Sequence, residues 1–479
     1  MTLAEILEIE NDAEILSFRC PDTGWLAWPT VRHAFLLYLI DELGYRWSWA
    51  VRPPPTLWEH RGAAAALARC VAHNVLAGRR GIARRPIVMF ASTGTLVPWG
   101  GRAFNRVSDH FAIDRAEQTC SYESVSPLRY EVPRDRANPS VLYTLPWVIR
   151  RYLTSACRPD RFDDVAARLT SFLVYRAKRL FGLTVSAERG AMTQTFIAKG
   201  LSRYGFERRW YERIFTDGRP RLLLATAGSQ GSLAAAIQIA HALGIPVAEC
   251  QHGHSGPGQP EYNFAPAVRD DAEYHSTLPD YFMSYGRWWT ERMNAPMRTV
   301  VIGNPHRSER LAMLTDAPAT ADRMDILVVA KHGEPERYIA LAAELARGMG
   351  DRFTIALRPD PRDRPSVLGT YPSGRIGSIV VDQMPDYYAS LTRAEIVVSG
   401  PSTTLAEAIG LARRIFIWEQ AGATFKYPDG TYEMFVTADE LIDRLKAPTP
   451  ESLTRPAPEE VWAPDWRHRY RRFVEPFLN

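Results

Sequence analysis

Hydrophobic residues along this chain alternate between short β-rich runs and longer segments with helical periodicity. The first clear strand covers residues 86–91, and the residues before it are mostly helical in pattern, as at 31–43. A strand at 221–226, a Gly-rich turn, a small-residue helix and a strand at 244–250 then form a βαβ unit, which requires parallel strands joined by a right-handed crossover. The first half of the chain therefore predicts a parallel sheet preceded by a helical region.

A second series of strands and helices begins near residue 299. The apolar runs that predict strands lie at 299–302, 325–330, 353–357, 378–381, 395–399 and 414–418. Amphipathic helical segments separate several of these runs. Apolar strands that alternate with helices are typical of a doubly wound sheet, because both faces of such a sheet are covered.

The length of 479 residues favours two domains, because single hydrophobic cores stop growing near about 250 to 300 residues. We expect an α/β chain with two Rossmann-like domains facing a central cleft: an N-terminal domain at 1–285 with helical insertions, and a C-terminal domain at 286–450. The chain is rich in proline after Lys446, so 451–479 predicts a linker and a C-terminal helix that packs back on the N-terminal domain. Doubly wound sheets bind ligands at the carboxyl ends of their strands, which places the chemistry in the cleft.

Composition and charge add limits to this picture. The net charge is only +4, and no nucleic-acid-binding motif is present, so we expect no nucleic-acid partner. Arginines gather with aromatic residues in the first half, a pattern that suits an anionic lipid surface or a phosphate-bearing substrate, although solvated helix faces also explain it. The five cysteines form no CxxC pair, and the N-terminus lacks the pattern of a signal peptide. We expect a cytoplasmic protein, at most peripheral on the inner face of the membrane.

The strongest candidate for a binding motif follows the strand at 395–399. Ser402, Thr403 and Thr404 fall at the cap and first turn of the next helix, where backbone N–H groups and hydroxyls can hold a phosphate. Glu407 lies one turn further on, where it can accept hydrogen bonds from a ribose. Plain helix capping is the structural alternative for these residue types.

Neighbouring loops offer further candidates for a nucleotide donor site. Arg358 ends a predicted strand, and its planar guanidinium suits bidentate contact with a phosphate, although a surface salt bridge is an equal alternative. Gln383 and Met384 follow the next strand and are candidates to contact a base. Lys331 and His306 would add positive charge near the phosphates.

A glycine-rich loop after the strand at 244–250 carries His252 and His254. Glycine lets the backbone approach a ligand closely, and a histidine at a strand end can act as a general base or contact a phosphate. We expect His252 to be catalytic and His254 to serve the acceptor side. Two histidines without a third ligand predict no metal site.

Acceptor-side candidates follow the first strand. Arg102 and Arg106 are placed in the sequence to recognise an anionic acceptor. Asp109, with Glu261 behind it, is the alternative to His252 as the base that removes a proton from an acceptor hydroxyl. A structural carboxylate at the surface is the other interpretation of both acids.

Several short motifs between about residues 221 and 420 carry a resemblance to a known family. They are the segment from Ser399 to Gly410, Arg358-Pro359-Asp360-Pro361, Gln251-His252-Gly253, Leu278-Pro279-Asp280 and Gly303-Asn304-Pro305. Through them the chain resembles GT-B glycosyltransferases that build bacterial capsule and lipopolysaccharide, near the sialyl- and Kdo-transferase and polyol-phosphate transferase branches. Asp360 departs from the pattern, because the family often carries a histidine there that touches the donor phosphate.

The resemblance implies a GT-B-like fold and a glycosyltransferase that moves a sugar from a nucleotide-activated donor to a bacterial surface glycan or lipid-linked glycan. It implies an inverting, metal-independent displacement without a cofactor, in which the helix start at Ser402 and Arg358 stabilise the charge on the leaving group. Two alternatives stay open. One is a nucleotide-sugar 2-epimerase-like enzyme, and the other is a catalytically inactive binding or scaffold protein of the same architecture.

Overall fold

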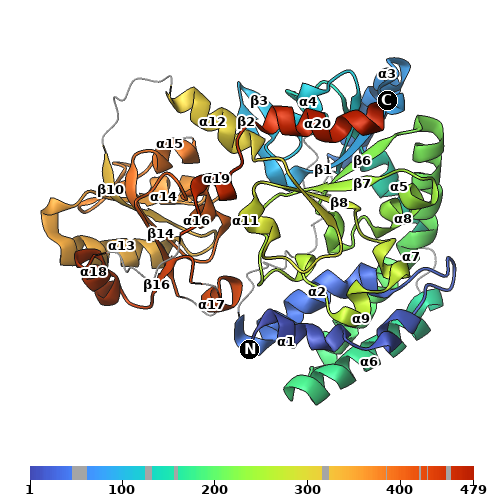
Figure 1. The fold of residues 1–479 in the computed structure, drawn as a ribbon, viewed down its shortest axis with the longest axis horizontal. Helices are drawn as coiled ribbons and strands as arrows, with labels where there is room; N and C mark the ends of the chain where they lie inside the picture. Colours follow the sequence, from blue (N-terminus) through green and yellow to red (C-terminus); the bar gives the residue numbers. More distant parts are fainter. Residues whose placement is uncertain are drawn as a thin grey trace.

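A computed structural model describes residues 1–45, 62–124, 132–155, 160–315, 323–384, 386–419, 422–428, 430–448 and 455–479. The ribbon forms two α/β units, each built around a seven-stranded sheet (Figure 1). Cys157 and residues 449–454 of the expected linker lie outside the described residues.

The N-terminal sheet is parallel throughout and has the strand order β5-β4-β1-β6-β7-β8-β9. Its strands are β1 (Ile87–Ser92), β4 (Thr119–Ser124), β5 (Val141–Tyr143), β6 (Leu222–Thr226), β7 (Val247–Cys250), β8 (Tyr281–Ser284) and β9 (Arg298–Val301). Because β9 pairs with β8, the sheet extends beyond the boundary that we expected at residue 285. The run at 299–302 therefore belongs to the first domain and not to the second.

Helices cover this sheet, and a small hairpin projects from it. The hairpin consists of β2 (Leu96–Trp99) and β3 (Arg102–Asn105). The helices are α1 (Leu3–Leu7), α2 (Trp28–Ile40), α3 (Ala63–Arg79), α4 (Asp109–Asp114), α5 (Leu145–Ser155), α6 (Asp163–Phe181), α7 (Ala187–Gly218), α8 (Ala234–Ala242), α9 (Pro266–Arg269), α10 (Ala272–His275) and α11 (Arg287–Thr290). The helical region before β1 is present as expected, and its helix α2 packs against α7.

The C-terminal sheet has the order β12-β13-β11-β10-β14-β15-β16 and is parallel except for the pair β12–β13. Its strands are β10 (Met324–Val329), β11 (Ile355–Arg358), β12 (Arg375–Ile376), β13 (Ile379–Val381), β14 (Ala394–Ser399), β15 (Arg414–Trp418) and β16 (Glu433–Phe435). Its helices are α12 (Pro305–Thr315), α13 (Pro335–Met349), α14 (Arg364–Thr370), α15 (Tyr387–Leu391), α16 (Thr403–Glu407), α17 (Ala423–Lys426), α18 (Ala438–Lys446) and α19 (Pro458–Val461). In both sheets the order reverses beside the first strand, as in Rossmann-like folds.

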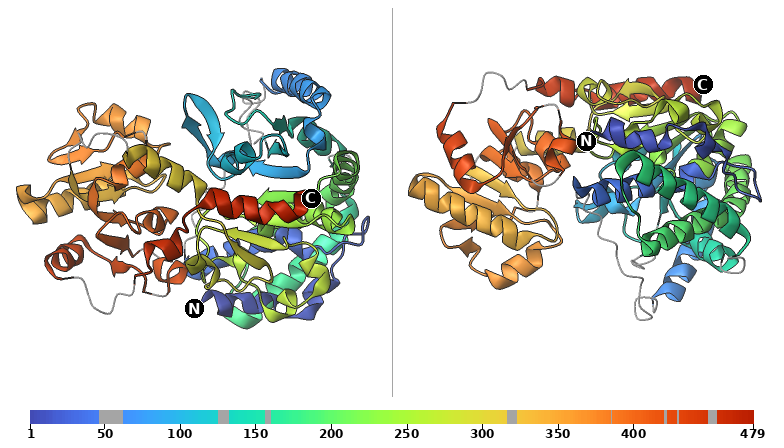
Figure 2. Two further views of the ribbon diagram at one scale, coloured as in Figure 1. Left: turned by 45° about the horizontal axis from the view of Figure 1, so that its top comes forward. Right: turned by 90° about the horizontal axis from the view of Figure 1, so that it is seen from below.

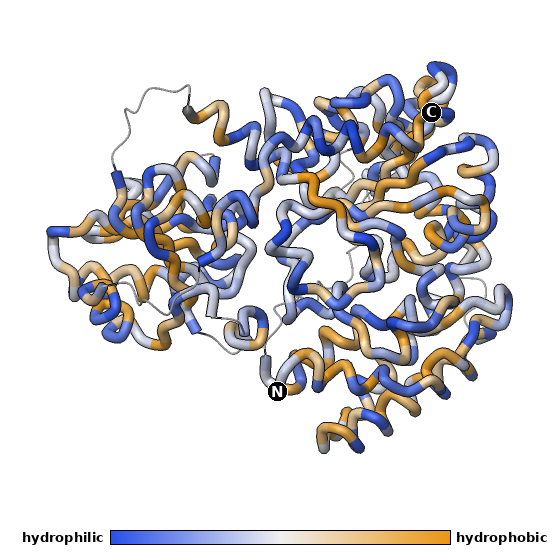
Figure 3. The backbone as a smooth tube through the Cα atoms, in the orientation of Figure 1, coloured by the Kyte–Doolittle hydropathy of each residue, from blue (hydrophilic) through white to orange (hydrophobic). Residues whose placement is uncertain are grey.

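Alternate residues along each central strand enter different cores, because successive side chains of a strand point to opposite faces. In β1, Val88 and Phe90 join the core under α2 and α7, whereas Ile87 and Met89 join the core on the other face. The strands of the C-terminal sheet divide between two cores in the same way. Hydrophobic residues accordingly concentrate along the central strands of both units (Figure 3). The predicted doubly wound architecture is confirmed.

The last helix, α20 (Trp466–Leu478), returns to the N-terminal unit and lies along it (Figure 2). Trp466, Tyr470 and Val474 are buried in the core that also holds Ile87 and Phe111. The chain therefore crosses between the two units twice. Within the described ranges, no helix is both long and apolar enough to cross a membrane.

Candidate functional site

The candidate site lies where the loops after β7 and β14 meet between the two domains. A Cβ placed on Gly253 would lie 3.8 Å from Cγ2 of Thr403, and one on Gly258 would lie 2.6 Å from the backbone oxygen of Phe425. Glycine is required at Gly258 because any side chain there would collide with the backbone of the other domain. The carboxyl ends of the two sheets thus face each other, as the sequence predicts.

A hydrogen-bonded chain leads from the end of β7 towards this interface. The hydroxyl of Tyr262 donates to Oε1 of Glu249 at 3.0 Å and lies 3.4 Å from Nδ1 of His252. Oε2 of Glu249 accepts hydrogen bonds from the backbone N–H and the hydroxyl of Ser229. Burial raises the pKa of Glu249 to about 7, and burial together with Arg106 lowers the pKa of His252 to about 4. His252 is therefore neutral at physiological pH, while Glu249 is close to its titration point.

Glu261, the second acid that the sequence analysis named, is a buried carboxyl group with an unsatisfied oxygen. Its side chain is 9% exposed and lies 4.0 Å from Nδ1 of His33. Its Oε2 has no hydrogen-bond partner among the described residues. Burial raises the pKa of Glu261 to about 7, and the nearby Glu249 adds to this shift. A carboxyl group that titrates near pH 7 suits general acid–base catalysis.

The helical region before β1 builds part of this site. Arg32, on α2, pairs with Glu10 at 2.7 Å, and both side chains are buried. Arg32 also donates to the backbone oxygens of Pro260 at 2.7 Å and Asn263 at 2.6 Å, on either side of Glu261. The helical region therefore fixes the segment that carries Glu261 and supplies His33 directly. Neither contribution is predicted by the sequence, because no local signal separates His33 from a core histidine.

Two lysines bring positive charge to the C-terminal side of the interface. Burial lowers the pKa of Lys426 to about 8, the nearby Lys331 lowers it further, and Glu261 opposes this shift. Burial also lowers the pKa of Lys331. Lys426 therefore lies within electrostatic range of both Lys331 and Glu261. Lys331 was predicted from the sequence, and Lys426 was missed.

The turn after β14 forms the predicted helix cap. Oγ of Ser402 accepts a hydrogen bond from the backbone N–H of Thr404 at 3.3 Å and donates to Oγ1 of Thr404 at 3.0 Å. Tyr427 donates to the backbone oxygen of Ser402, and Tyr387 donates to that of Thr404. The turn is held from two directions, and Thr403 faces the loop of the other domain. Its role in phosphate binding stays a prediction.

Glu407 connects the two domains. Its Oε1 accepts a hydrogen bond from the hydroxyl of Tyr388 at 3.1 Å and lies 3.6 Å from Nη1 of Arg106. Burial raises the pKa of Glu407, and Arg106 opposes that shift. Glu407, predicted to bind the donor, therefore forms an ion pair with Arg106, predicted to bind the acceptor.

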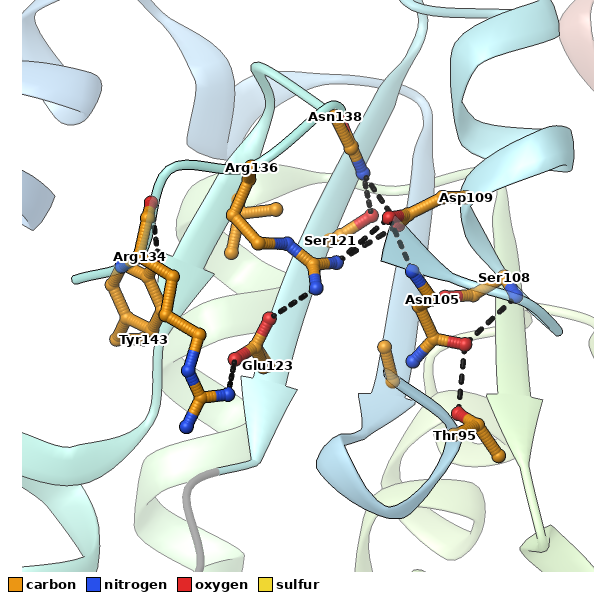
Figure 4. Close-up of polar contacts among 12 residues, drawn as sticks. Thr95, Asn105, Ser108, Asp109, Ser121, Glu123, Arg134, Arg136, Asn138 and Tyr143 are labelled. Atoms are coloured by element: carbon orange, nitrogen blue, oxygen red, sulfur yellow. Dashed lines mark hydrogen bonds and ion pairs between the residues drawn. The ribbon is translucent and has the colours of Figure 1, made fainter. Parts of the chain in front are cut away.

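Asp109 is not placed to act as the base that we predicted. It is fully buried in the N-terminal domain, where its carboxylate accepts hydrogen bonds from Arg136, Asn138 and the backbone N–H of Asn105 (Figure 4). Arg136 also lies 3.2 Å from Glu123. These contacts hold the turn from which Arg106 projects, so the structure gives Asp109 a supporting role.

Arg358 is likewise not placed to bind a donor phosphate. It is 4% exposed, and its Nη1 donates to Asp382 at 2.6 Å, to Ser390 at 2.8 Å and to the backbone oxygen of Met384 at 2.9 Å. A guanidinium engaged in this way stabilises the loops of its own domain. The side chain of Gln383 is exposed and packs against Gly374.

The remaining predicted residues are dispersed. His306 is buried among aromatic rings, beside His110 at 3.4 Å, and burial lowers its pKa to about 2, so it carries no charge for a phosphate. Arg102 is 59% exposed and pairs with Asp135. His254 packs between the rings of Trp289 and Tyr427, and burial lowers its pKa to about 3.

A possible set of metal ligands lies in the loops after β10 and β11. The ligand atoms of His332, Asp360 and Asp363 all lie within 4.8 Å of one another. Nδ1 of His332 already bonds Asp363 at 2.9 Å, and Asp360 accepts two hydrogen bonds from the side chain of Arg362. The three groups are therefore satisfied by protein partners. Asp360, which stands in place of the family histidine, faces Arg362.

Both domains are Rossmann-like, their strand ends face each other, and the last helix returns to the first domain. The fold is GT-B-like. The solved structures that it resembles include the UDP-GlcNAc 2-epimerase of Methanocaldococcus jannaschii with UDP-GlcNAc and UDP, at 10% identity over 82% of this chain and 99% of that chain, with a TM-score of 0.43. The 2-epimerase of Neisseria meningitidis bound to UDP-GlcNAc matches at 11% identity over 82% and 99%, with a TM-score of 0.44. The glycotransferase of kitacinnamycin matches at 12% identity over 83% and 100%, with a TM-score of 0.40.

Neither a family model nor a curated protein matches the chain.

Proposed function

We propose that the chain is an enzyme that binds a nucleotide sugar between its two domains and breaks the bond between the sugar and the nucleotide. The observation that carries this proposal is the close approach of Gly253 to Thr403. This approach brings the loops that carry the proton-exchanging groups of one domain to the helix cap of the other. Cleavage needs a proton-transfer group near the sugar and positive charge or N–H donors near the leaving phosphate, and both kinds of group meet here.

Each part of the site has a proposed role. Lys331 and Lys426 stabilise the charge on the leaving phosphate, and the turn at Ser402 and Thr403 orients it. Glu407 binds the ribose after its ion pair with Arg106 has opened. Glu261 exchanges a proton with the substrate, since its pKa of about 7 leaves both protonation states accessible.

Glycosyl transfer to a surface glycan or lipid-linked glycan is one form of this proposal. An inverting displacement needs one base beside the acceptor hydroxyl, and Glu261 in its ionised form is that base. The lysines supply the charge that a metal ion would otherwise bring to the leaving group. The product of this reaction appears only when an acceptor is present.

Epimerisation of the nucleotide sugar is the second form, and the pair of buried carboxyl groups favours it. Glu249 and Glu261 both have their pKa raised to about 7, so one can hold a proton while the other has lost it. Epimerisation by elimination and re-addition removes a proton from carbon and later returns one, which suits two such groups. This reaction needs no acceptor.

Thermal unfolding with a panel of nucleotides and nucleotide sugars tests binding first, because a ligand that binds only the folded chain raises its melting temperature. We expect a selective rise that is lost in Lys426→Met and kept in Arg102→Ala, an exposed arginine outside the site. A folded sample that responds to no nucleotide would refute the proposal.

Incubation in heavy water then separates the two reactions. Deuterium in the recovered sugar without an acceptor identifies an epimerase, whereas nucleotide release that depends on a glycan acceptor identifies a transferase. Binding without either reaction would contradict the enzyme and identify a binding or scaffold protein.

A further inference from the structure

A cavity lies between α5 and α7, two helices on the side of the N-terminal unit that faces away from the C-terminal unit (Figure 1). Its volume is about 570 Å³, within the range of small-molecule sites. Ala83 and Gly218, which line it, precede β1 and β6. The cavity is therefore near the amino ends of these strands, whereas the nucleotide site that we propose is at the carboxyl ends.

The charged side chains that line this cavity are mostly positive. Four arginines, Arg84, Arg150, Arg209 and Arg213, line it with a single acid, Asp217. Arg213 and Asp217 form an exposed pair at 3.5 Å. Within the described part of the chain, neither Arg84 nor Arg209 forms an ion pair. Guanidinium groups in such numbers suit a phosphate, which they can contact in a bidentate way.

Aromatic rings form the other part of the lining. The rings of Trp147 and Trp210 stack with centroids 5.1 Å apart, and Tyr122 and Phe206 lie beside them. Nε1 of Trp210 is buried and has no acceptor among the described residues. Because this atom has almost no accessible surface, Trp210 offers the cavity an apolar ring face and not a hydrogen-bond donor.

Exposed apolar side chains on α5, and on α3 which packs against it, indicate what kind of molecule carries the phosphate. Leu153, on α5, is 62% exposed. Val75 and Leu76, on α3, are 51% and 56% exposed, and α3 packs against α5. Arginines and tryptophans beside exposed aliphatic residues are typical of surfaces that enter the interface of a bilayer. A soluble phosphate would make no use of these aliphatic groups.

We propose that the cavity between α5 and α7 binds the phosphate-bearing headgroup of an anionic membrane lipid. The arginines contact the phosphate, the aromatic rings line the cavity beside it, and the exposed Leu153 on α5 meets the acyl region. Binding at this cavity is separate from the proposed nucleotide site, so vesicle binding without nucleotide tests it alone.

The test is co-sedimentation of the full chain with phosphatidylglycerol/phosphatidylcholine vesicles and with phosphatidylcholine vesicles. We expect binding to the anionic vesicles only, and a loss of about tenfold or more in Arg84→Glu/Arg209→Glu. The matched control is Arg347→Glu/Arg375→Glu, which makes the same charge change at exposed positions of the C-terminal domain and should keep its binding. If the reversal variant does not fold, Arg84→Ala/Arg209→Ala should show a smaller loss.

Equal losses in the reversal and control variants would overturn the proposal, because they would show attraction by net charge alone. Wild-type chain that stays unbound to anionic vesicles would also overturn it. Nucleotide-dependent stabilisation should be unchanged in Arg84→Glu/Arg209→Glu, so failure of this proposal and failure of the nucleotide proposal are distinguishable.

Discussion

Two groups of buried carboxylates in the N-terminal domain are surrounded in different ways. Asp109 and Glu123 lie on either side of Arg136, and Asp109 also accepts hydrogen bonds from an amide side chain and a backbone N–H. Glu249 is hydrogen-bonded to neutral donors, and Oε2 of Glu261 has no hydrogen-bond partner among the described residues. Burial raises the pKa of all four.

The difference shows that burial alone does not identify a reactive acid. A carboxylate whose oxygens are engaged by a buried arginine stabilises a turn and is not free to exchange a proton with a substrate. A buried carboxyl group without such a partner gains and loses its proton near pH 7. The partners of the two groups, and not their depth, separate structural acids from candidate catalytic ones.

Removal of Arg136 should have the largest effect on stability. Arg136→Met leaves Asp109 and Glu123 as two buried acids without their shared cation, and we expect a loss of about 3 to 5 kcal/mol in the free energy of unfolding of the N-terminal domain. Urea denaturation followed by tryptophan fluorescence measures this loss. Arg102→Met, at an exposed ion pair, should change it by no more than about 1 kcal/mol. Similar effects of the two changes would contradict the structural role of the network.

The acids without an arginine partner should instead be detectable in the pH dependence of the free energy of unfolding. The pKa of Glu261 rises from its ordinary 4.5 to about 7 in the folded chain, so the folded state binds more protons between these values. The free energy of unfolding therefore falls as pH rises through this window and levels off above about pH 7. Glu261→Gln should remove this part of the slope in denaturation curves recorded from pH 5 to 8. An unchanged slope would contradict the raised pKa.

The smallest effect concerns Arg106, which links the two groups. The network at Asp109 holds the turn before Arg106, and the charge of Arg106 lowers the pKa of His252. Arg106→Ala should raise that pKa only slightly, because burial is the larger cause. Histidine resonances followed by NMR titration measure it, with Arg102→Ala as the control. A His252 pKa near 6.5 in Arg106→Ala would show that the charge, and not burial, dominates.

The sequence predicts most of the longer apolar strands, but not the short β5 and β8 or the polar β4. β4 carries the buried residues Ser121, which accepts a hydrogen bond from Asn138, and Glu123, which forms an ion pair with Arg136. These partners lie outside the strand, so no local pattern marks it. The run at β9 was assigned to the wrong domain for a related reason: its pairing with β8 depends on the fold, and the residues of β9 alone do not indicate it.

Some residues of the candidate site follow from their position in the sequence, and others do not. His252 and Glu261 stand in a loop after a strand, where position alone is informative, and the structure brings both to the interface. His33 and Lys426 arrive there by packing of distant segments, which no spacing rule predicts. The guanidinium of Arg358 is chemically suited to a phosphate, but the sequence did not predict its ion pair with Asp382.

The most direct test compares Glu261→Gln with Asp109→Asn in turnover of whichever nucleotide sugar stabilises the chain. We predict that Glu261→Gln stays folded and loses about 10²- to 10⁴-fold in turnover, as expected for the loss of a general acid–base group. Asp109→Asn should be less stable, yet keep its turnover per folded molecule at a temperature below its unfolding transition. Full turnover in Glu261→Gln, together with a large loss in folded Asp109→Asn, would contradict the account.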